Sequence, residues 1–201
     1  MESLDPRINR WQINPEGTSN KQALDQLVTF EVFLQMREGR AFEHAGIVHA
    51  SGLEMAFVFA KEQFSRRYTC TGMWVIATAD LTLTEYTDLE ENVYDLIGET
   101  PTPSDAKPQS YEVFHLLKRG KQHKHVGQVE ASSAQHALHE AKKTFNDGSP
   151  VLNIWVGPTA KFLYSKEEDK VIWSTLKEKK HREVISYKAA DKLKAYKERT
   201  Q

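Results

Sequence analysis

YEVFHLLKRGKQHKHVGQVEASSAQHALHEAKKTF, residues 111–145, has a counterpart earlier in the same chain. FEVFLQMREGRAFEHAGIVHASGLEMAFVFAKEQF, residues 30–64, aligns with it without a gap at a shift of 81 positions. When the alignment is continued to residues 79 and 160, 17 of the 50 pairs are identical, which is far more than chance would give. Such a repeat has to be recognised first, because it changes the meaning of every motif inside it. We therefore interpret the chain as a tandem duplication.

Each copy begins with the pattern of a β-hairpin. Apolar side chains alternate along a first strand in both copies, and a glycine, Gly39 or Gly120, marks the turn that follows. In the second strand of the first copy, His44, Gly46 and Val48 recur at every other position, and the second copy repeats the pattern. Residues at this spacing share one face of a strand, so we expect this face to meet the core.

A helix and a third strand complete each copy. Ser51 with Glu54, and Ser132 with Gln135, match the capping box that begins a helix. An apolar stripe at helical spacing follows in both copies and ends at a phenylalanine.

The third strand of each copy carries a tryptophan, Trp74 or Trp155, which we expect to anchor the core. One helix over a small sheet predicts an α+β fold, β-grasp-like, with a ferredoxin-like fold as the alternative. A unit of about 50 residues is marginal alone, so we expect the two strand-strand-helix-strand repeats to pack together as a pseudo-dimer.

Composition suggests how the rest of the chain is divided. We expect an N-terminal arm, a first repeat, an acidic and solvated linker, a second repeat and a basic C-terminal tail, at residues 1–28, 29–80, 81–109, 110–164 and 165–201. In the tail, the pattern favours a strand around residues 171–173 and a helix over residues 187–199. The basic residues of the tail form either a solvated helix face or a docking surface for an acidic partner.

Charge and hydropathy exclude several classes of function. The formal net charge is −1 and the sequence pI is about 6.7, so no overall basic field attracts nucleic acid or an anionic membrane. No stretch has the length and hydrophobicity of a membrane span, and the first residues lack the apolar core of a signal peptide. The single cysteine, Cys70, fits a reducing compartment, and we interpret it as a small buried side chain. These features predict a cytoplasmic protein that contacts proteins or small molecules.

Four histidines of the second copy could suggest a metal enzyme. His123 and His125 would share a strand face, and His136 and His139 a helix face, which makes a two-element site conceivable. Only His125 has a histidine at the matching place of the first copy, His44. Metal binding confined to one copy therefore stays open as the least favoured hypothesis. We expect His44 and His125 to have a structural role, such as a ring hydrogen bond that fixes the hairpin.

No catalytic constellation emerges from the motifs. Glu112 and His115 have the Glu-x-x-His spacing of di-iron sites, but those sites need the pair on a helix, and here it falls on a predicted strand. The sequence also lacks a phosphate-binding glycine loop, a Gly-x-Ser-x-Gly motif and a CxxC motif. We therefore predict no catalytic, cofactor-binding or metal residues.

The two predicted helices differ on the face away from the shared stripe. The first carries Met55, Val58 and Phe59 at helical spacing, whereas the second is polar there. These apolar residues either pack against the other repeat or the tail, or they form an interface for another protein.

The ordered motifs resemble a known family. YEVF, RGK, HKHVG and IWV, at residues 111–114, 119–121, 123–127 and 154–156, follow one another as in the small B subunit of ring 1,2-phenylacetyl-CoA epoxidase, also called phenylacetate-CoA oxygenase. The first copy keeps FEVF, His44, Gly46 and WV. The resemblance therefore covers both copies, whereas usual members of the family carry one copy and self-associate.

The resemblance implies a non-catalytic component. In that family the B subunit links heterodimers of a di-iron catalytic A subunit and a structural C subunit, and a reductase supplies electrons. We therefore expect a scaffolding subunit of a phenylacetyl-CoA oxygenase that binds the A and C subunits, with the reductase as a further candidate partner, and that has no cofactor of its own. The alternative is an interaction module of another cytoplasmic assembly.

Overall fold

The computed structural model describes residues 27–65, 70–87, 91–98, 106–171 and 189–199. The first repeat contains β1 (Val28–Gln35), β2 (Glu43–Ala50), α1 (Leu53–Phe64) and β3 (Gly72–Ala77). The second repeats the order with β5 (Gln109–Leu116), β6 (Lys124–Ala131), α3 (Ala134–Phe145) and β7 (Asn153–Pro158). The elements outside this pattern are β4 (Thr82–Leu83), α2 (Val93–Leu96), β8 (Leu163–Tyr164), α5 (Ala189–Arg199) and three 3₁₀ turns, η1 (Thr78–Asp80), η2 (Thr159–Lys161) and η3 (Glu167–Lys170). The predicted α+β class and the two strand-strand-helix-strand repeats are confirmed.

Within each repeat the sheet is antiparallel. β1 lies between β2 and β3 and is antiparallel to both, and β5 stands in the same relation to β6 and β7. β2 and β3 are therefore parallel to each other with β1 between them, the split β-α-β arrangement that ferredoxin-like folds also contain. A β-grasp sheet is mixed, so the β-grasp comparison extends to the helix over a small sheet and not to the strand directions.

Short strands are exchanged between the repeats. β4 follows the first repeat in the chain but pairs with β7 of the second, and β8 follows the second repeat but pairs with β3 of the first. On the other side, β2 meets β6 at Glu43 and Lys124. The result is one eight-stranded sheet in the order β4-β7-β5-β6-β2-β1-β3-β8. Because each repeat contributes a strand to the other, the two copies form a single body.

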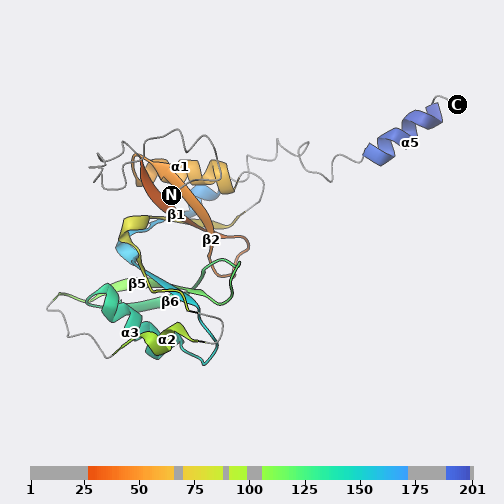
Figure 1. The fold of residues 1–201 in the computed structure, drawn as a ribbon. Helices are drawn as coiled ribbons and strands as arrows, with labels where there is room; N and C mark the ends of the chain where they lie inside the picture. The colour runs from red at the N-terminus through yellow and green to blue at the C-terminus, as the bar shows by residue number, and fades with distance from the viewer. Residues whose placement is uncertain (1–26, 66–69, 88–90, 99–105, 172–188, 200–201) are drawn as a thin grey trace, which may run out of the picture.

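The sheet folds so that the two repeats face each other, with α1 and α3 on the outer sides (Figure 1). One core lies under each helix, and a third lies between the repeats. In this third core Phe33 stacks on Phe114, its counterpart in the alignment, with ring centroids 4.2 Å apart. Residues 30–34 of β1 are all buried, because the helix covers one face and the other repeat covers the opposite one. The expectation that the two copies pack on each other is confirmed.

A β-bulge corrects the predicted face of the second strand. Val32 is opposite Gly46, but the next residue, Phe33, is opposite His44, so Ala45 is the extra residue. Side chains of directly opposed residues lie on the same side of a sheet, and a bulge re-aims the side chains beyond it. His44 therefore shares the inner face with Phe33, whereas Gly46 lies against α1. The second repeat has the same irregularity between Val113 and Phe114 and their partners.

The predicted capping boxes were one residue out of place. The N-cap of α1 is Gly52, which has no side chain to cap the helix. The N-cap of α3 is Ser133, whose side-chain oxygen accepts a hydrogen bond from the backbone N–H of His136. Each helix therefore begins one residue later than the capping box predicts, and Ser51 and Ser132 lie just outside the capping position.

The segment that we predicted as a solvated linker is partly packed. Leu81, Val93 and Tyr94 are buried, and the last two belong to the core under α3. The sequence did not indicate this packing, because the apolar side chains of the segment are scattered among acidic residues. In the tail, Val171 lies outside any strand and residues 172–173 fall outside the described residues, while α5 accounts for most of the expected helix.

Among the described helices, none has the length and hydrophobicity to cross a membrane.

Candidate functional site

A histidine–glutamate pair sits at the same place in each repeat. Nε2 of His44 lies 2.7 Å from Oε2 of Glu31, and Nε2 of His125 lies 2.7 Å from Oε2 of Glu112. Each hydrogen bond joins the two strands of one hairpin, so the type of ring hydrogen bond that we expected is present. Its contribution to stability remains a prediction.

Each of these histidines also packs against the tryptophan of the other repeat. The ring of His44 lies 5.0 Å from Trp155 and that of His125 lies 4.8 Å from Trp74, both with edge-on geometry. The bulges account for this arrangement, because they turn both histidines to the inner face. The four residues that the repeats share therefore meet at the junction between the copies, which supports their assignment as structural residues.

The two glutamates differ in their further partners. Glu112 is fully buried and also accepts hydrogen bonds from Gln128 and from the Tyr164 hydroxyl at 2.8 Å. Burial alone would raise the pKa of Glu112, but the hydrogen bonds from His125, Tyr164 and Gln128 outweigh it and hold the pKa below its usual value. Burial and the Glu112 carboxylate together raise the pKa of Tyr164. Both carboxylate oxygens of Glu112 are thus used in internal contacts.

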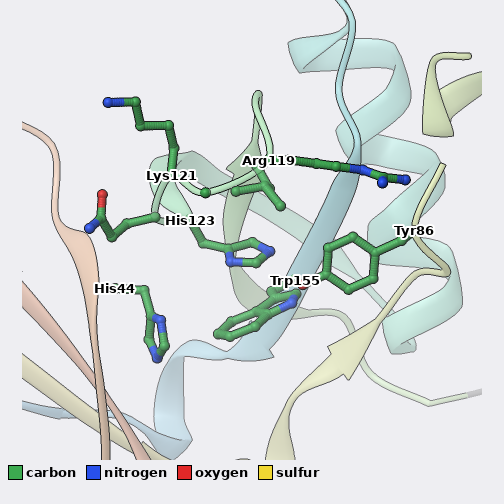
Figure 2. Close-up of a pocket in the computed structure, with 9 residues that line it drawn as sticks. His44, Tyr86, Arg119, Lys121, His123 and Trp155 are labelled. Atoms are coloured by element: carbon green, nitrogen blue, oxygen red, sulfur yellow. The ribbon is translucent and has the colours of Figure 1, made fainter. Parts of the chain in front are cut away.

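A pocket of about 450 Å³ opens at the junction on the side of the second repeat. Its walls include side chains from both repeats and from the segment between them (Figure 2): His44, Tyr86, Arg119, Lys121, His123 and Trp155. His123 stacks on Trp155 with ring centroids 3.9 Å apart, and Phe42 stacks on Trp74 at the same separation in the first repeat. Each repeat thus has a ring stacked on its tryptophan, and the pocket lies beside the stack in which that ring is a histidine and not a phenylalanine.

The protonation of His123 is fixed by its surroundings. The side-chain N–H₂ of Asn153 donates to the carbonyl oxygen of Thr84 at 2.6 Å, so its Oδ1 faces the Nε2 of His123 at 2.7 Å. Nε2 must then carry the proton and donate it. Burial is the main cause that lowers the pKa of His123 to about 4, so the ring is neutral at neutral pH. Sequence reasoning missed this role, although the replacement of Phe42 by a histidine in the second copy was a signal that could have revealed it.

The histidines of the metal hypothesis are not brought together. His123 lies against Trp155, His125 lies against Trp74, and His136 and His139 lie on α3, on the outer face of the sheet. Within the described ranges, no three side chains of His, Cys, Asp or Glu form a group that could hold a metal ion.

Other potentially reactive groups serve as internal contacts. Glu112 bonds to His125, whereas His115 bonds to the hydroxyl of buried Tyr94, so the Glu-x-x-His pair has separate partners. Burial raises the pKa of the Cys70 thiol to about 11, which disfavours the nucleophilic thiolate.

The apolar side chains singled out on the first helix are exposed. Met55, Val58 and Phe59 retain 45 %, 51 % and 43 % of their accessible surface. α1 lies on the outer side of its own sheet (Figure 1), so the other repeat does not cover this face. Packing by the tail, the other option of that interpretation, falls largely on residues 172–188, outside the described residues. At the corresponding place on α3, Nε2 of His136 lies 3.3 Å from Oε1 of Glu140. One helix thus presents an apolar surface and its counterpart a polar one; a partner interface at the former remains a prediction.

Comparison with known proteins identifies the family. The family model described as Phenylacetic acid degradation B matches residues 26–96 and 107–194. The B subunit of 1,2-phenylacetyl-CoA epoxidase from Escherichia coli (strain K12) is 26% identical over 94 residues, which are 47% of this chain and 90% of that protein. No solved structure matches. Since the family model covers both repeats and most of the chain, this protein belongs to the Phenylacetic acid degradation B family.

Proposed function

We propose that this chain is a non-catalytic scaffolding subunit of a multicomponent phenylacetyl-CoA oxygenase. The main support is that two copies of the family's unit form one body. They are joined by exchanged strands on one side and by the pairing of β2 with β6 on the other. Such a body has two related faces held at a fixed separation, which suits a component that bridges partners.

The internal use of the ionisable groups supports a structural role. Glu31 and Glu112 accept hydrogen bonds from histidines of their own hairpins, and Tyr164 is bonded to Glu112. A general acid or base needs an ionisable atom that can reach a substrate. These groups instead hold strands and repeats together.

The partners that we propose are the di-iron catalytic A subunit and the structural C subunit, with the reductase as a further candidate. These assignments come from the resemblance to the family. We propose the cytoplasm as the location, because the pathway's acyl-CoA chemistry belongs there and the chain has a single buried cysteine.

The surface of Met55, Val58 and Phe59 is the candidate interface for one of these subunits. Monomeric proteins seldom expose grouped large apolar side chains without a function, and aromatic and methionine side chains are enriched at interfaces. The polar counterpart on α3 means that the two outer faces of this body are not equivalent.

The proposal is tested by co-purifying the tagged chain with the A and C subunits and assaying epoxidation of phenylacetyl-CoA with and without it. We expect a stable complex, iron only in the A subunit and activity that depends on this chain. An absent complex together with full activity without the chain would overturn the proposal.

The interface is tested with a matched pair of variants. Val58→Asp places a charge in the apolar surface, and His139→Asp places one at the position on α3 that the repeat makes equivalent. Both positions are on the outer side of a helix, so both variants should fold. We expect Val58→Asp, and more strongly its combination with Phe59→Asp, to lose binding while His139→Asp retains it. Normal binding by the folded double variant would refute this interface.

The alternative is an interaction module of the same fold that serves another assembly. The co-purification separates the two, because such a module would be recovered with other proteins and not with the oxygenase subunits. Metal analysis of the purified chain tests the least favoured hypothesis, a metal enzyme; one metal ion per chain would support it.

A further inference from the structure

The pocket at the repeat junction shows how far the two copies have diverged. Its wall includes Arg119, Lys121 and His123 from the turn of the second hairpin. At the positions 81 residues earlier, the first repeat has Glu38, an arginine and Phe42. The second copy therefore has an added cation and an added ring nitrogen where the first has a carboxylate and a hydrocarbon ring. Since the backbones of the two turns match, with positive φ at the glycine of each, the difference lies in the side chains.

The wall of the pocket carries two cationic side chains, Arg119 and Lys121, and one buried N–H donor. Trp155 is 8 % exposed, and its indole Nε1 is buried without a hydrogen-bond partner among the described residues. The residues that line the pocket include no aspartate or glutamate. Arg119 and Lys121 extend from the turn in opposite directions (Figure 2): Arg119 points towards Tyr86, and Lys121 points away from Tyr86. A buried N–H without an acceptor is unfavourable, so an acceptor that enters here recovers a lost interaction.

We propose that this pocket binds a carboxylate side chain from an acidic segment of a partner protein, once per chain. The cations attract the segment, the aromatic rings of Tyr86 and Trp155 contact its apolar parts, and the indole N–H is available to the carboxylate after a small movement of the Tyr86 ring. Tyr86 is 60 % exposed, which leaves it room to move. Tryptophan, tyrosine and arginine are the residues most enriched at the energetic centres of protein interfaces.

A protein segment is favoured over a free anion by the shape and composition of the site. The pocket lies at the surface, and Arg119, Lys121 and Tyr86 on its wall are exposed. An aromatic wall with cations at the edge suits an extended chain that carries both apolar and acidic side chains. The inference rests on the proposed function for the identity of the partner, which is another component of the oxygenase.

The test compares two charge reversals of equal size. One variant carries Arg119→Glu and Lys121→Glu, and the control carries Arg37→Glu and Arg40→Glu in the corresponding turn of the first repeat. Affinity of each full chain for the purified complex of A and C subunits is measured at about 0.15 M salt. We expect the pocket variant to bind about tenfold more weakly or worse and the control to stay within about threefold of the wild type. The affinity of the wild type should also fall as salt rises, and that of the pocket variant should fall less.

A direct readout locates the contact. A carbodiimide, which couples an amine to a carboxyl group without a spacer, should link Lys121 to an aspartate or glutamate of a partner protein, as detected by mass spectrometry. If both charge-reversal variants lose the same affinity, or if neither loses any, the pocket is not the binding site, while the scaffold role still stands. Failure of the wild type to bind the A and C subunits would overturn both. If acetate or inorganic phosphate occupies the pocket at millimolar concentration without competing with the subunits, the site is one for a free anion and the proposal is wrong.

Discussion

Replacement of His123 by phenylalanine should change how stability depends on pH. His123 is 4 % exposed, and its pKa in the folded chain is about 4, against 6.5 for the free side chain. Between these values the unfolded chain binds a proton that the folded chain does not, so the free energy of unfolding falls as the pH is lowered. A difference of this size is worth at most about 3.5 kcal/mol, since one pKa unit is about 1.4 kcal/mol. The charges that face the ring are His44, which opposes its protonation, and Glu31, which favours it.

The substitution His123→Phe reproduces the first repeat, in which Phe42 stacks on Trp74 at the same ring separation. The phenyl ring should therefore fit. At pH 7 the variant should be less stable by about 1–2 kcal/mol, because Oδ1 of Asn153 loses its donor. Towards pH 4 the difference should shrink and reverse, because the variant has no imidazole to protonate at this place.

The assay is urea unfolding followed by circular dichroism at pH values from about 8 to about 4. His115, whose pKa burial also lowers to about 4, is present in both proteins, so most of its contribution cancels; the part that does not cancel comes from the charge of His123, which also lowers the pKa of His115. Parallel stability curves for the wild type and the variant would refute the assignment of this pH dependence to His123. A variant that fails to fold at pH 7 would refute the equivalence of the two stacked rings.

Three further outcomes are expected. Gly127→Ala should destabilise the chain by about 2–4 kcal/mol, because φ is 151° and an added Cβ would lie 2.7 Å from the ring of Phe145. Its control, Gly120→Ala, should cost only about 1 kcal/mol, because φ there is 76° and nothing lies within 4 Å of an added Cβ. Phe114→Ala should lower the free energy of unfolding by about 3–5 kcal/mol in a single transition of both repeats, and separate transitions in calorimetry would contradict this. A fragment of residues 84–171 lacks β4 and exposes the core between the repeats, so it should dimerise by exchanging β8. A folded monomer in analytical ultracentrifugation would argue against strand exchange as what holds the two repeats together.

The repeat was the strongest predictor in the sequence, because it tested every assignment twice. The element order, the turn glycines and the two tryptophans all followed from residues that agree between the copies. The packing of the repeats on each other followed from size alone. Those features depend on periodicity and burial, which the order of apolar side chains records directly.

Features that depend on one residue or on distant pairing were not predictable. The bulge inserts Ala45 and thereby turns His44 to the face opposite Gly46, although strict alternation places the two together. β4 and β8 contain two residues each, too few for a periodic pattern. In the candidate site, sequence reasoning singled out the exposed surface on α1 but missed the pocket, because its members come from both repeats and from the segment between them.

The joining of the two repeats in one chain explains why the copies can differ. In a symmetric dimer of single repeats, a change at one stack would occur at both, and each altered stack would have to serve stability as well as binding. A single chain removes this constraint. Phe42 can stack on Trp74 as a purely apolar contact, while His123 stacks on Trp155 beside a pocket that Arg119 and Lys121 also line. The same reasoning applies to the outer helices, where α1 exposes an apolar surface and α3 a polar one. Duplication thus keeps the geometry of two equal halves and lets each half present a different chemistry to its partners.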